Sequence, residues 1–143
     1  MGNQNQKAIV KKLENSIGRD KVHIKGTIKT PDIYLNKNEG VIKLKGRSIP
    51  ENAKELYYPI IEWTENYIKS SSSKTNLIFQ LEYFNTASSK MIFELINTLK
   101  ITLDQGKKLN IEWHYMEDDD DILDSGETFQ EISGLDFNFY SYE

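Results

Sequence analysis

The stretch Asn76–Gly106, NLIFQLEYFNTASSKMIFELINTLKITLDQG, contains the two patterns that decide the fold. In residues 76–84 apolar and polar side chains alternate, which is the period of a β-strand with one buried face. The apolar positions are Leu77, Phe79, Leu81 and Tyr83. The next apolar stripe has the 3.6-residue period of an amphipathic helix, at Ile92, Ile96, Leu99 and Leu103. Asn85-Thr86 joins the two, so the sequence predicts a strand, a tight corner and a helix that ends near Gly106.

Similar patterns precede this unit. The segment Asp32–Gly46 predicts a hairpin, because the strand-like runs DIYL and VIKLK flank the turn-forming residues NKNEG. Pro50-Glu51-Asn52 predicts a helix start, followed by residues at helical spacing: Leu56, Ile60, Trp63, Thr64 and Tyr67. Pro59 lies inside this pattern and lacks an N–H group. We therefore expect either a kink at Pro59 or a helix whose main part begins there.

The C-terminal third continues the alternation of strands and helices. Residues 109–115 predict a strand, residues 127–131 a short helix, and the apolar residues from Leu135 to Phe139 a last strand. The expected order is β-β-α-β-α-β-α-β, a single α/β domain with a mixed, mostly parallel sheet. Because the two central strands alternate instead of being apolar throughout, we expect helices mainly on one face.

The other face of the predicted sheet is polar. It should carry Gln80, Glu82, Asn110, Glu112 and His114. We expect Lys43 and Lys45 of the hairpin to join this face and to pair with its glutamates across strands. The face either meets water or is covered by a partner or by residues 1–24, which predict a short helix or a loosely held arm. We therefore divide the chain into an N-terminal extension, 1–24, and a domain, 25–143.

Composition restricts the classes of function. The 143 residues suit one domain, and 38% hydrophobic with 28% charged residues is typical of a soluble protein. A net charge of −4 gives no reason to expect nucleic-acid binding. The absence of cysteine excludes disulfides, thiolate zinc sites and thiol catalysis. No apolar run predicts a membrane span or a secretory signal, so we expect a cytoplasmic protein.

The segment LEYFNTASSKMIFELINTL, residues 81–99, resembles the SiaC family of regulatory phosphoproteins and, more distantly, the STAS domains of anti-sigma-factor antagonists. Further segments carry the resemblance: Pro50-Glu51-Asn52 with Glu55-Leu56, Trp63, and Asn110–Tyr115 before an acidic stretch. It runs from about Ile28 to Phe139 and implies a STAS-like fold for a bacterial signalling protein without catalytic residues or cofactors.

The resemblance also implies a site. The family's phosphoacceptor is the threonine of an Asn-Thr-Ser-Ser sequence, and that threonine matches Thr86. The implied cycle of partner switching uses a serine/threonine kinase of the anti-sigma-factor type and a PP2C-like phosphatase. The unphosphorylated form then binds an output protein, a diguanylate cyclase in characterised members, which implies a role in c-di-GMP signalling and biofilm regulation. The expected contact residues are Asn85, Ala87 (where the family usually has serine), Ser88, Ser89 and Lys90.

Thr86 also has a purely structural interpretation. A threonine at a helix start is commonly an N-cap, and Thr86 could cap through the N–H of Ser89. The phosphoacceptor interpretation rests on a different property of the same place. The first N–H groups of a helix have no partners within the helix and favour a phosphate, which Lys90 could help to bind.

Two alternatives belong to other classes of protein. A small metal-dependent or enzymatic domain would use His114 and the acidic loop 117–121. The loop does not follow the calcium-binding EF-hand pattern, because Leu123 and Ile132 occupy ligand positions when the motif is started at Asp121. A structural homodimer would use the polar sheet face or an edge strand.

Overall fold

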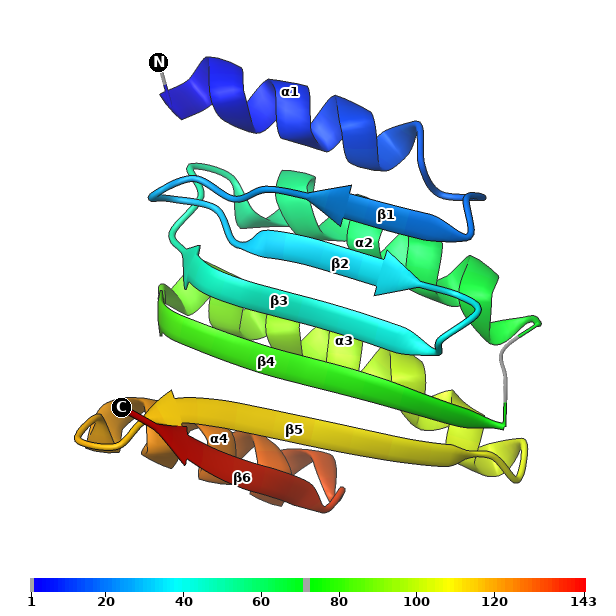
Figure 1. Cartoon of the computed structure of the whole chain (residues 1–143), viewed down its shortest axis with the longest axis vertical. Coiled ribbons are helices and arrows are strands. Elements are labelled where there is room, and N and C mark those ends of the chain that lie inside the picture. Colours follow the sequence, from blue (N-terminus) through cyan, green and yellow to red (C-terminus); the bar gives the residue numbers. More distant parts are fainter. Residues whose placement is uncertain (1, 71–72) are drawn as a thin grey trace.

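The computed structural model describes residues 2–70 and 73–143 as one six-stranded sheet with four helices (Figure 1). The order along the chain is α1 (Gly2–Glu14), β1 (Lys21–Ile24), β2 (Asp32–Asn36), β3 (Val41–Ser48), α2 (Ala53–Ile68), β4 (Lys74–Phe84), α3 (Thr86–Asp104), β5 (Lys108–Met116), α4 (Asp120–Ser133) and β6 (Phe137–Tyr142). From β2 onward this is the predicted order. The strand β1 was not predicted.

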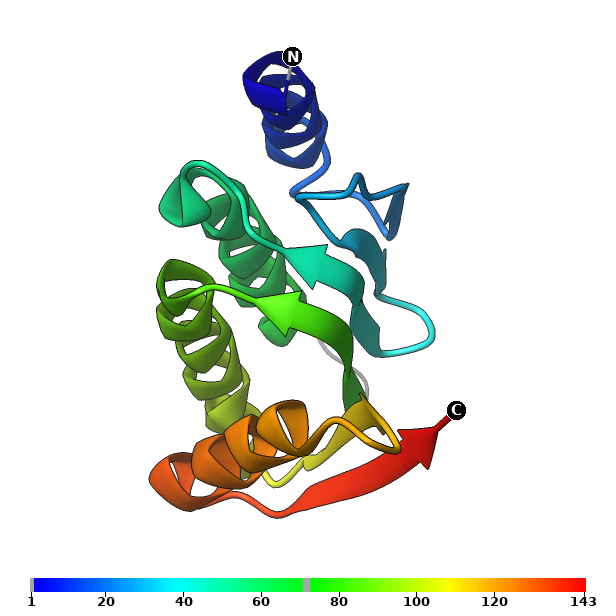
Figure 2. The same ribbon diagram turned by 90° about the vertical axis from the view of Figure 1, so that its left-hand side faces the viewer.

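The strands are arranged in the sheet in their order along the chain, from β1 to β6. The pairs β1–β2 and β2–β3 are antiparallel, whereas β3–β4, β4–β5 and β5–β6 are parallel. Because the strand order never reverses, right-handed crossovers place every connecting helix on the same face. Figure 2 shows α2, α3 and α4 on one side of the sheet and no element over the other. The predicted one-sided α/β fold is confirmed.

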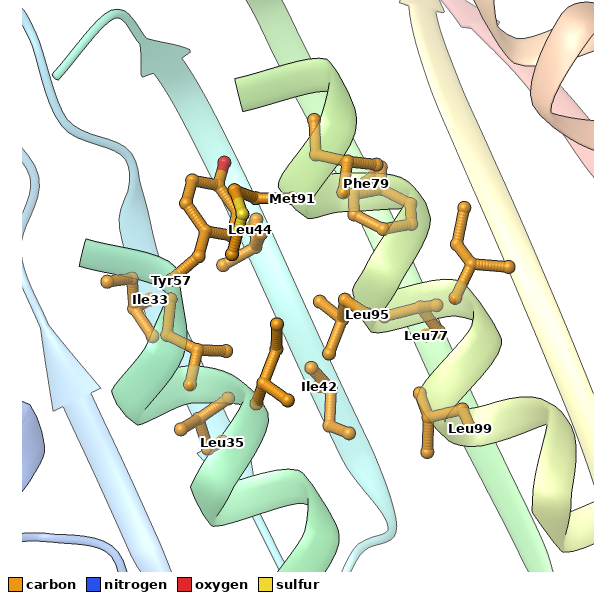
Figure 3. Packing of buried hydrophobic residues seen from close by; sticks show 14 of the residues in the cluster. Ile33, Leu35, Ile42, Leu44, Tyr57, Leu77, Phe79, Met91, Leu95 and Leu99 are labelled. Atoms are coloured by element: carbon orange, nitrogen blue, oxygen red, sulfur yellow. The ribbon is translucent and has the colours of Figure 1, made fainter. Parts of the chain in front are cut away.

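The core lies between the sheet and α2 and α3. Side chains that point to the helices from β2, β3 and β4 have no exposed surface: Ile33, Leu35, Ile42, Leu44, Leu77 and Phe79. They contact the apolar stripes of the two helices, including Tyr57, Met91, Leu95 and Leu99 (Figure 3). Trp63 and Trp113 are buried in the same core. Pro59 is buried inside α2, which runs unbroken through it.

The N-terminal residues form a helix that packs on the domain. Ile9, Val10 and Leu13 belong to the hydrophobic core, and α1 contacts α2. The Gln6 side chain fastens α1 to the loop before α2, since its Nε2 donates to the Asn52 carbonyl at 3.1 Å and its Oε1 accepts from the Glu51 N–H at 2.9 Å. Of the two alternatives for the N-terminal extension, residues 2–14 have the helix, and residues 21–24 belong to the sheet as β1.

One sequence-based placement and one predicted cross-strand pairing on the sheet are wrong. Tyr83, predicted to continue the buried face of β4, is 50% exposed. An irregularity in the β3–β4 pairing leaves Glu82 without a partner, so Tyr83 points away from the helices and Phe84 packs into the core instead. Lys43 and Lys45 lie on the open face as predicted, but their cross-strand neighbours are Tyr34 and Asp32 on β2 and Ile78 and Gln80 on β4, not glutamates. No described carboxylate oxygen lies within 4.0 Å of either ammonium group.

Candidate functional site

The predicted corner between strand and helix lies between β4 and α3. Asn85 has extended backbone angles, φ −86° and ψ 173°, and its side chain accepts a hydrogen bond from the Ser88 N–H at 2.8 Å. Asn85 is therefore the N-cap of α3, and the suggestion that Thr86 caps the helix is wrong. The Ser89 N–H instead donates to the Asn85 carbonyl at 2.9 Å. Thr86 is the first residue of the helix, and its side chain takes no part in capping.

Thr86 is exposed, and its hydroxyl has no hydrogen-bond partner among residues 2–70 and 73–143. The backbone N–H groups of Thr86 and Ala87 likewise have no acceptor within those ranges. Free N–H groups at the positive end of the 19-residue helix α3 provide a favourable environment for an anion. A phosphate on this hydroxyl would be solvated and close to these donors, so the arrangement can accept it without unfolding.

A buried network of hydroxyl groups holds this corner from below. The Ser88 hydroxyl lies 2.9 Å from that of Ser48 and donates to the Ser48 carbonyl at 3.0 Å. The Ser48 hydroxyl in turn lies 2.7 Å from the Tyr57 hydroxyl, and all three residues have no exposed surface. The same Ser48 carbonyl accepts from the Asn85 N–H at 3.0 Å. The end of β3, the first half of α2 and the first turn of α3 are thereby joined directly under Thr86.

The electrostatics of this network follow from its burial. Burial raises the pKa of Tyr57 to about 12, although its hydrogen bonds with Ser48 and Ser88 favour ionisation. The phenol is therefore neutral near pH 7 and available as a donor. With neutral partners on all sides, the network stabilises the corner by hydrogen bonding and introduces no buried charge.

Comparisons with known proteins decide the family. A family model described as SiaC family regulatory phosphoprotein matches residues 24–142, which is most of the chain. The chain belongs to the SiaC family. This membership confirms the resemblance carried by residues 81–99.

Individual SiaC-family relatives agree in fold and length. The chain is similar to SiaC of Pseudomonas aeruginosa in its apo crystal structure, with 29% identity, 86% of this chain and 98% of that chain covered, and a TM-score of 0.74. It also matches a chain in the crystal structure of the P. aeruginosa diguanylate cyclase SiaD in complex with its activator SiaC, with 28% identity, coverage of 85% and 99%, and a TM-score of 0.79. An uncharacterized protein of P. aeruginosa strain UCBPP-PA14 is 28% identical over 122 residues, 85% of this chain and 97% of its own length.

The other predicted contact residues of this SiaC-family chain differ in accessibility. Ala87 and Lys90 are exposed, and Asn85 and Ser89 are partly exposed. Ser88 has no exposed surface and is bonded to Ser48, so it supports the corner from inside and we no longer count it as a contact residue. Sequence reasoning missed Ser48 and Tyr57, because nothing local in the sequence links them to the corner.

The alternative metal-dependent or enzymatic site would use His114 and the acidic loop 117–121, whose side chains have structural contacts of their own. Nε2 of His114 lies 2.9 Å from Oε1 of Glu112, and its ring stacks on Tyr140 with 5.0 Å between ring centroids. In the acidic loop, Asp119 is the N-cap of α4, where its Oδ1 accepts from the Ile122 N–H at 3.0 Å. No group of three or more His, Asp or Glu side chains that could hold a metal ion occurs in the described ranges. In the same ranges, no helix has the length and apolar composition required to cross a membrane.

Proposed function

We propose that this protein is a non-catalytic cytoplasmic switch whose state is set by phosphorylation of Thr86. A serine/threonine kinase of the anti-sigma-factor type adds the phosphate and a PP2C-like phosphatase removes it. The unphosphorylated form binds and activates an output protein, a diguanylate cyclase. The observation that carries the proposal is the exposed Thr86 hydroxyl, which has no partner in the described chain and stands at the start of α3.

The physical effect of phosphorylation follows from charge. A phosphothreonine carries about −1.5 to −2 charges near pH 7. At a helix N-terminus the dipole stabilises such an anion by about 0.3–1 kcal/mol, so the domain stays folded. A partner surface that covers Thr86 would have to remove water from this dianion, which is costly unless the phosphate is paired. Phosphorylation therefore prevents docking without unfolding the protein.

The choice of output protein rests on likeness. The SiaC chain that this protein resembles over 85% of its length is named as the activator of a diguanylate cyclase, and the two are crystallised together. The family description as a regulatory phosphoprotein supports the same type of mechanism. A role in c-di-GMP signalling follows for this chain if its own partner is also a cyclase.

Phosphate mapping tests the proposal. The purified chain is incubated with ATP and the anti-sigma-type kinase of its own organism, and peptides are analysed by mass spectrometry. We expect one phosphate on Thr86, no modification of Thr86→Ala, and normal modification of the matched control Ser89→Ala. Modification of Ser89 in the wild type, or of Thr86→Ala at the wild-type rate, would refute the assignment.

The consequence for the output protein is tested separately. The organism's diguanylate cyclase is assayed for c-di-GMP synthesis with the unphosphorylated chain, the phosphorylated chain and Thr86→Glu. We expect activation only by the unphosphorylated protein. If the phosphorylated chain activates equally well, Thr86 does not control docking.

A further inference from the structure

A row of positive charges follows β3 on the face of the sheet that no helix covers. Lys43, Lys45 and Arg47 alternate with side chains that point to the helices, namely Ile42, Leu44 and Ser48, so all three cations point outward. Four residues of strand span about 13 Å. In the described chain, no carboxylate oxygen lies within 4.0 Å of any of the three cationic groups. We refer to Lys43, Lys45 and Arg47 as the cationic row.

A hollow of about 470 Å³ lies against the row. Its apolar surface comes from Val41, Ile78 and the ring of Tyr34, and Lys43 and Lys45 also line it. The two acidic residues in the hollow already accept hydrogen bonds from the protein. Glu39 accepts from the Tyr34 hydroxyl at 2.6 Å, and Asp32 accepts from the Gly26 N–H. Asp32 is the cross-strand neighbour of Lys45 and, like Glu39, keeps its negative charge, but no described carboxylate oxygen lies within 4.0 Å of either lysine ammonium group. The hollow therefore offers an apolar surface beside two lysines that form no ion pair within the described chain.

The row leads to the corner that carries Thr86. Arg47 lies over the ring of the exposed Tyr83, 5.8 Å from its centroid. Tyr83 is two residues before Asn85, and Ser48, the neighbour of Arg47, accepts the Asn85 N–H. Tyrosine and arginine are both enriched in binding hot spots. The row thus runs along β3 from the hollow to the end of the sheet where β4 leads into α3.

We propose that the cationic row and the hollow bind an acidic, amphipathic segment of the output protein. Carboxylates of that segment pair with Lys43, Lys45 and Arg47, and an apolar side chain fills the hollow over Val41 and Ile78. The inference rests on the proposed function for the identity of the partner. The chain's net charge of −4 disfavours nucleic acid and anionic membranes as occupants of so small a basic area.

This surface also gives the phosphate a specific target. Arginine binds phosphate and carboxylate groups through the same fork of donors. A phosphate on Thr86 adds negative charge at the end of the sheet where β3 ends, and it repels an acidic segment that comes within a Debye length of about 8 Å. The sign of the partner's charge thus explains why phosphorylation prevents binding.

A peptide titration tests the surface without any assumption about the cyclase. The probe is a synthetic amphipathic helical peptide that contains only glutamate and leucine, added to the ¹⁵N-labelled full chain. We expect saturable, salt-sensitive shifts of the amide signals of residues 41–47 and 78. A matched peptide with lysine in place of glutamate should give no such shifts. Shifts that do not saturate, or that lie on the helical face, would overturn the proposal.

Charge reversal tests the same surface with the organism's cyclase. The variant Lys43→Glu/Lys45→Glu/Arg47→Glu should need a concentration at least about tenfold higher to activate the cyclase, because close charge pairs with the partner are lost. The control Lys7→Glu/Lys11→Glu/Lys54→Glu has the same net charge but reverses exposed lysines on α1 and α2, and should retain activation.

The outcomes separate the two proposals. Activation lost equally in both triple variants, or in neither, overturns the acidic-segment inference while cyclase activation by the wild type still stands. If the peptide shifts the amide signals of the cationic row but the wild-type chain does not activate the cyclase, the proposed output protein is refuted and the binding surface for an acidic segment still stands. Sedimentation of the free chain tests a second copy as the occupant, and a dimer abolished by the row variant would overturn the inference.

Discussion

The replacement Gly126→Ala tests how the sheet and α4 fit together. Gly126 is buried inside α4, and a Cβ added there would lie 2.5 Å from Cδ1 and Nε1 of Trp113 and 2.7 Å from its Cγ. The indole ring cannot easily move, because its N–H donates to the Ile122 carbonyl at 2.9 Å. The ring is also packed among four aromatic neighbours, Phe79, Phe84, Phe129 and Phe137.

The magnitude follows from two opposing effects. Alanine in place of glycine inside a helix favours folding by about 1 kcal/mol. An additional group forced into a packed core opposes it by about 1–3 kcal/mol, and a lost indole hydrogen bond adds about 1 kcal/mol. We expect a net loss of about 2 kcal/mol in the free energy of unfolding, or about 4–8 °C in Tm.

Urea unfolding monitored by tryptophan fluorescence measures this change. The matched control is Gly18→Ala, since Gly18 is exposed and an added Cβ there has no atom within 4 Å. The control should keep the wild-type stability or exceed it slightly. If Gly126→Ala were as stable as the control, α4 would not pack against Trp113 as described.

Two further predictions concern the corner itself. Asn85→Ala and Asn52→Ala each remove a helix N-cap, and each should lower the free energy of unfolding by about 1 kcal/mol in urea titrations. Only Asn85→Ala should slow phosphorylation of Thr86. Equal phosphorylation rates in the two variants would show that the cap does not position the threonine. Burial raises the pKa of Tyr57 from 10.0 to about 12, so the native state favours the neutral phenol. The resulting contribution to the free energy of unfolding is about 2–3 kcal/mol; it is complete below pH 10 and lost as the pH rises through 12. Tyr57→Phe should therefore flatten the stability profile between pH 10 and 12, and an unchanged slope there would contradict the burial of this hydroxyl.

The corner could be predicted because its two patterns are long. Eleven residues of β4 and nineteen of α3 each repeat their period several times, and the Asn85-Thr86 junction lies where one period replaces the other. The strand β1 was missed because its four residues, Lys21–Ile24, show only two periods of alternation. Its pairing with β2 decides its conformation, and such pairing is not visible locally.

Other errors arose where register departs from simple alternation. The irregularity beside Glu82 changes the phase of β4, so Tyr83 lies on the open face although its spacing matches the buried residues. Alternation correctly placed Lys43 and Lys45 on the polar face, but it could not give their neighbours, which register shows to be Tyr34 and Asp32 on β2 and Ile78 and Gln80 on β4. The resulting unpaired lysines are the basis of the cationic row.

In the candidate site, too, local features were predictable from the sequence and contacts between distant residues were not. Sequence reasoning named the candidate residues adjacent to Thr86, and the proposed role of Thr86 came from the resemblance to the family. The network under it joins Ser48 to Ser88, which are 40 positions apart, and to Tyr57 on another helix. Hydrogen bonds between such distant residues depend on how the helices dock on the sheet, so a sequence pattern cannot predict them.

The central claim is that one phosphate on Thr86 switches docking and leaves the fold intact. The most direct measurement compares binding of the cyclase to the kinase-treated and the untreated chain, with circular dichroism recorded on both samples. The account predicts identical spectra and Tm values within the usual error, together with loss of binding only in the phosphorylated sample. Retained binding by a chain fully phosphorylated on Thr86, or loss of its folded spectrum, would contradict it.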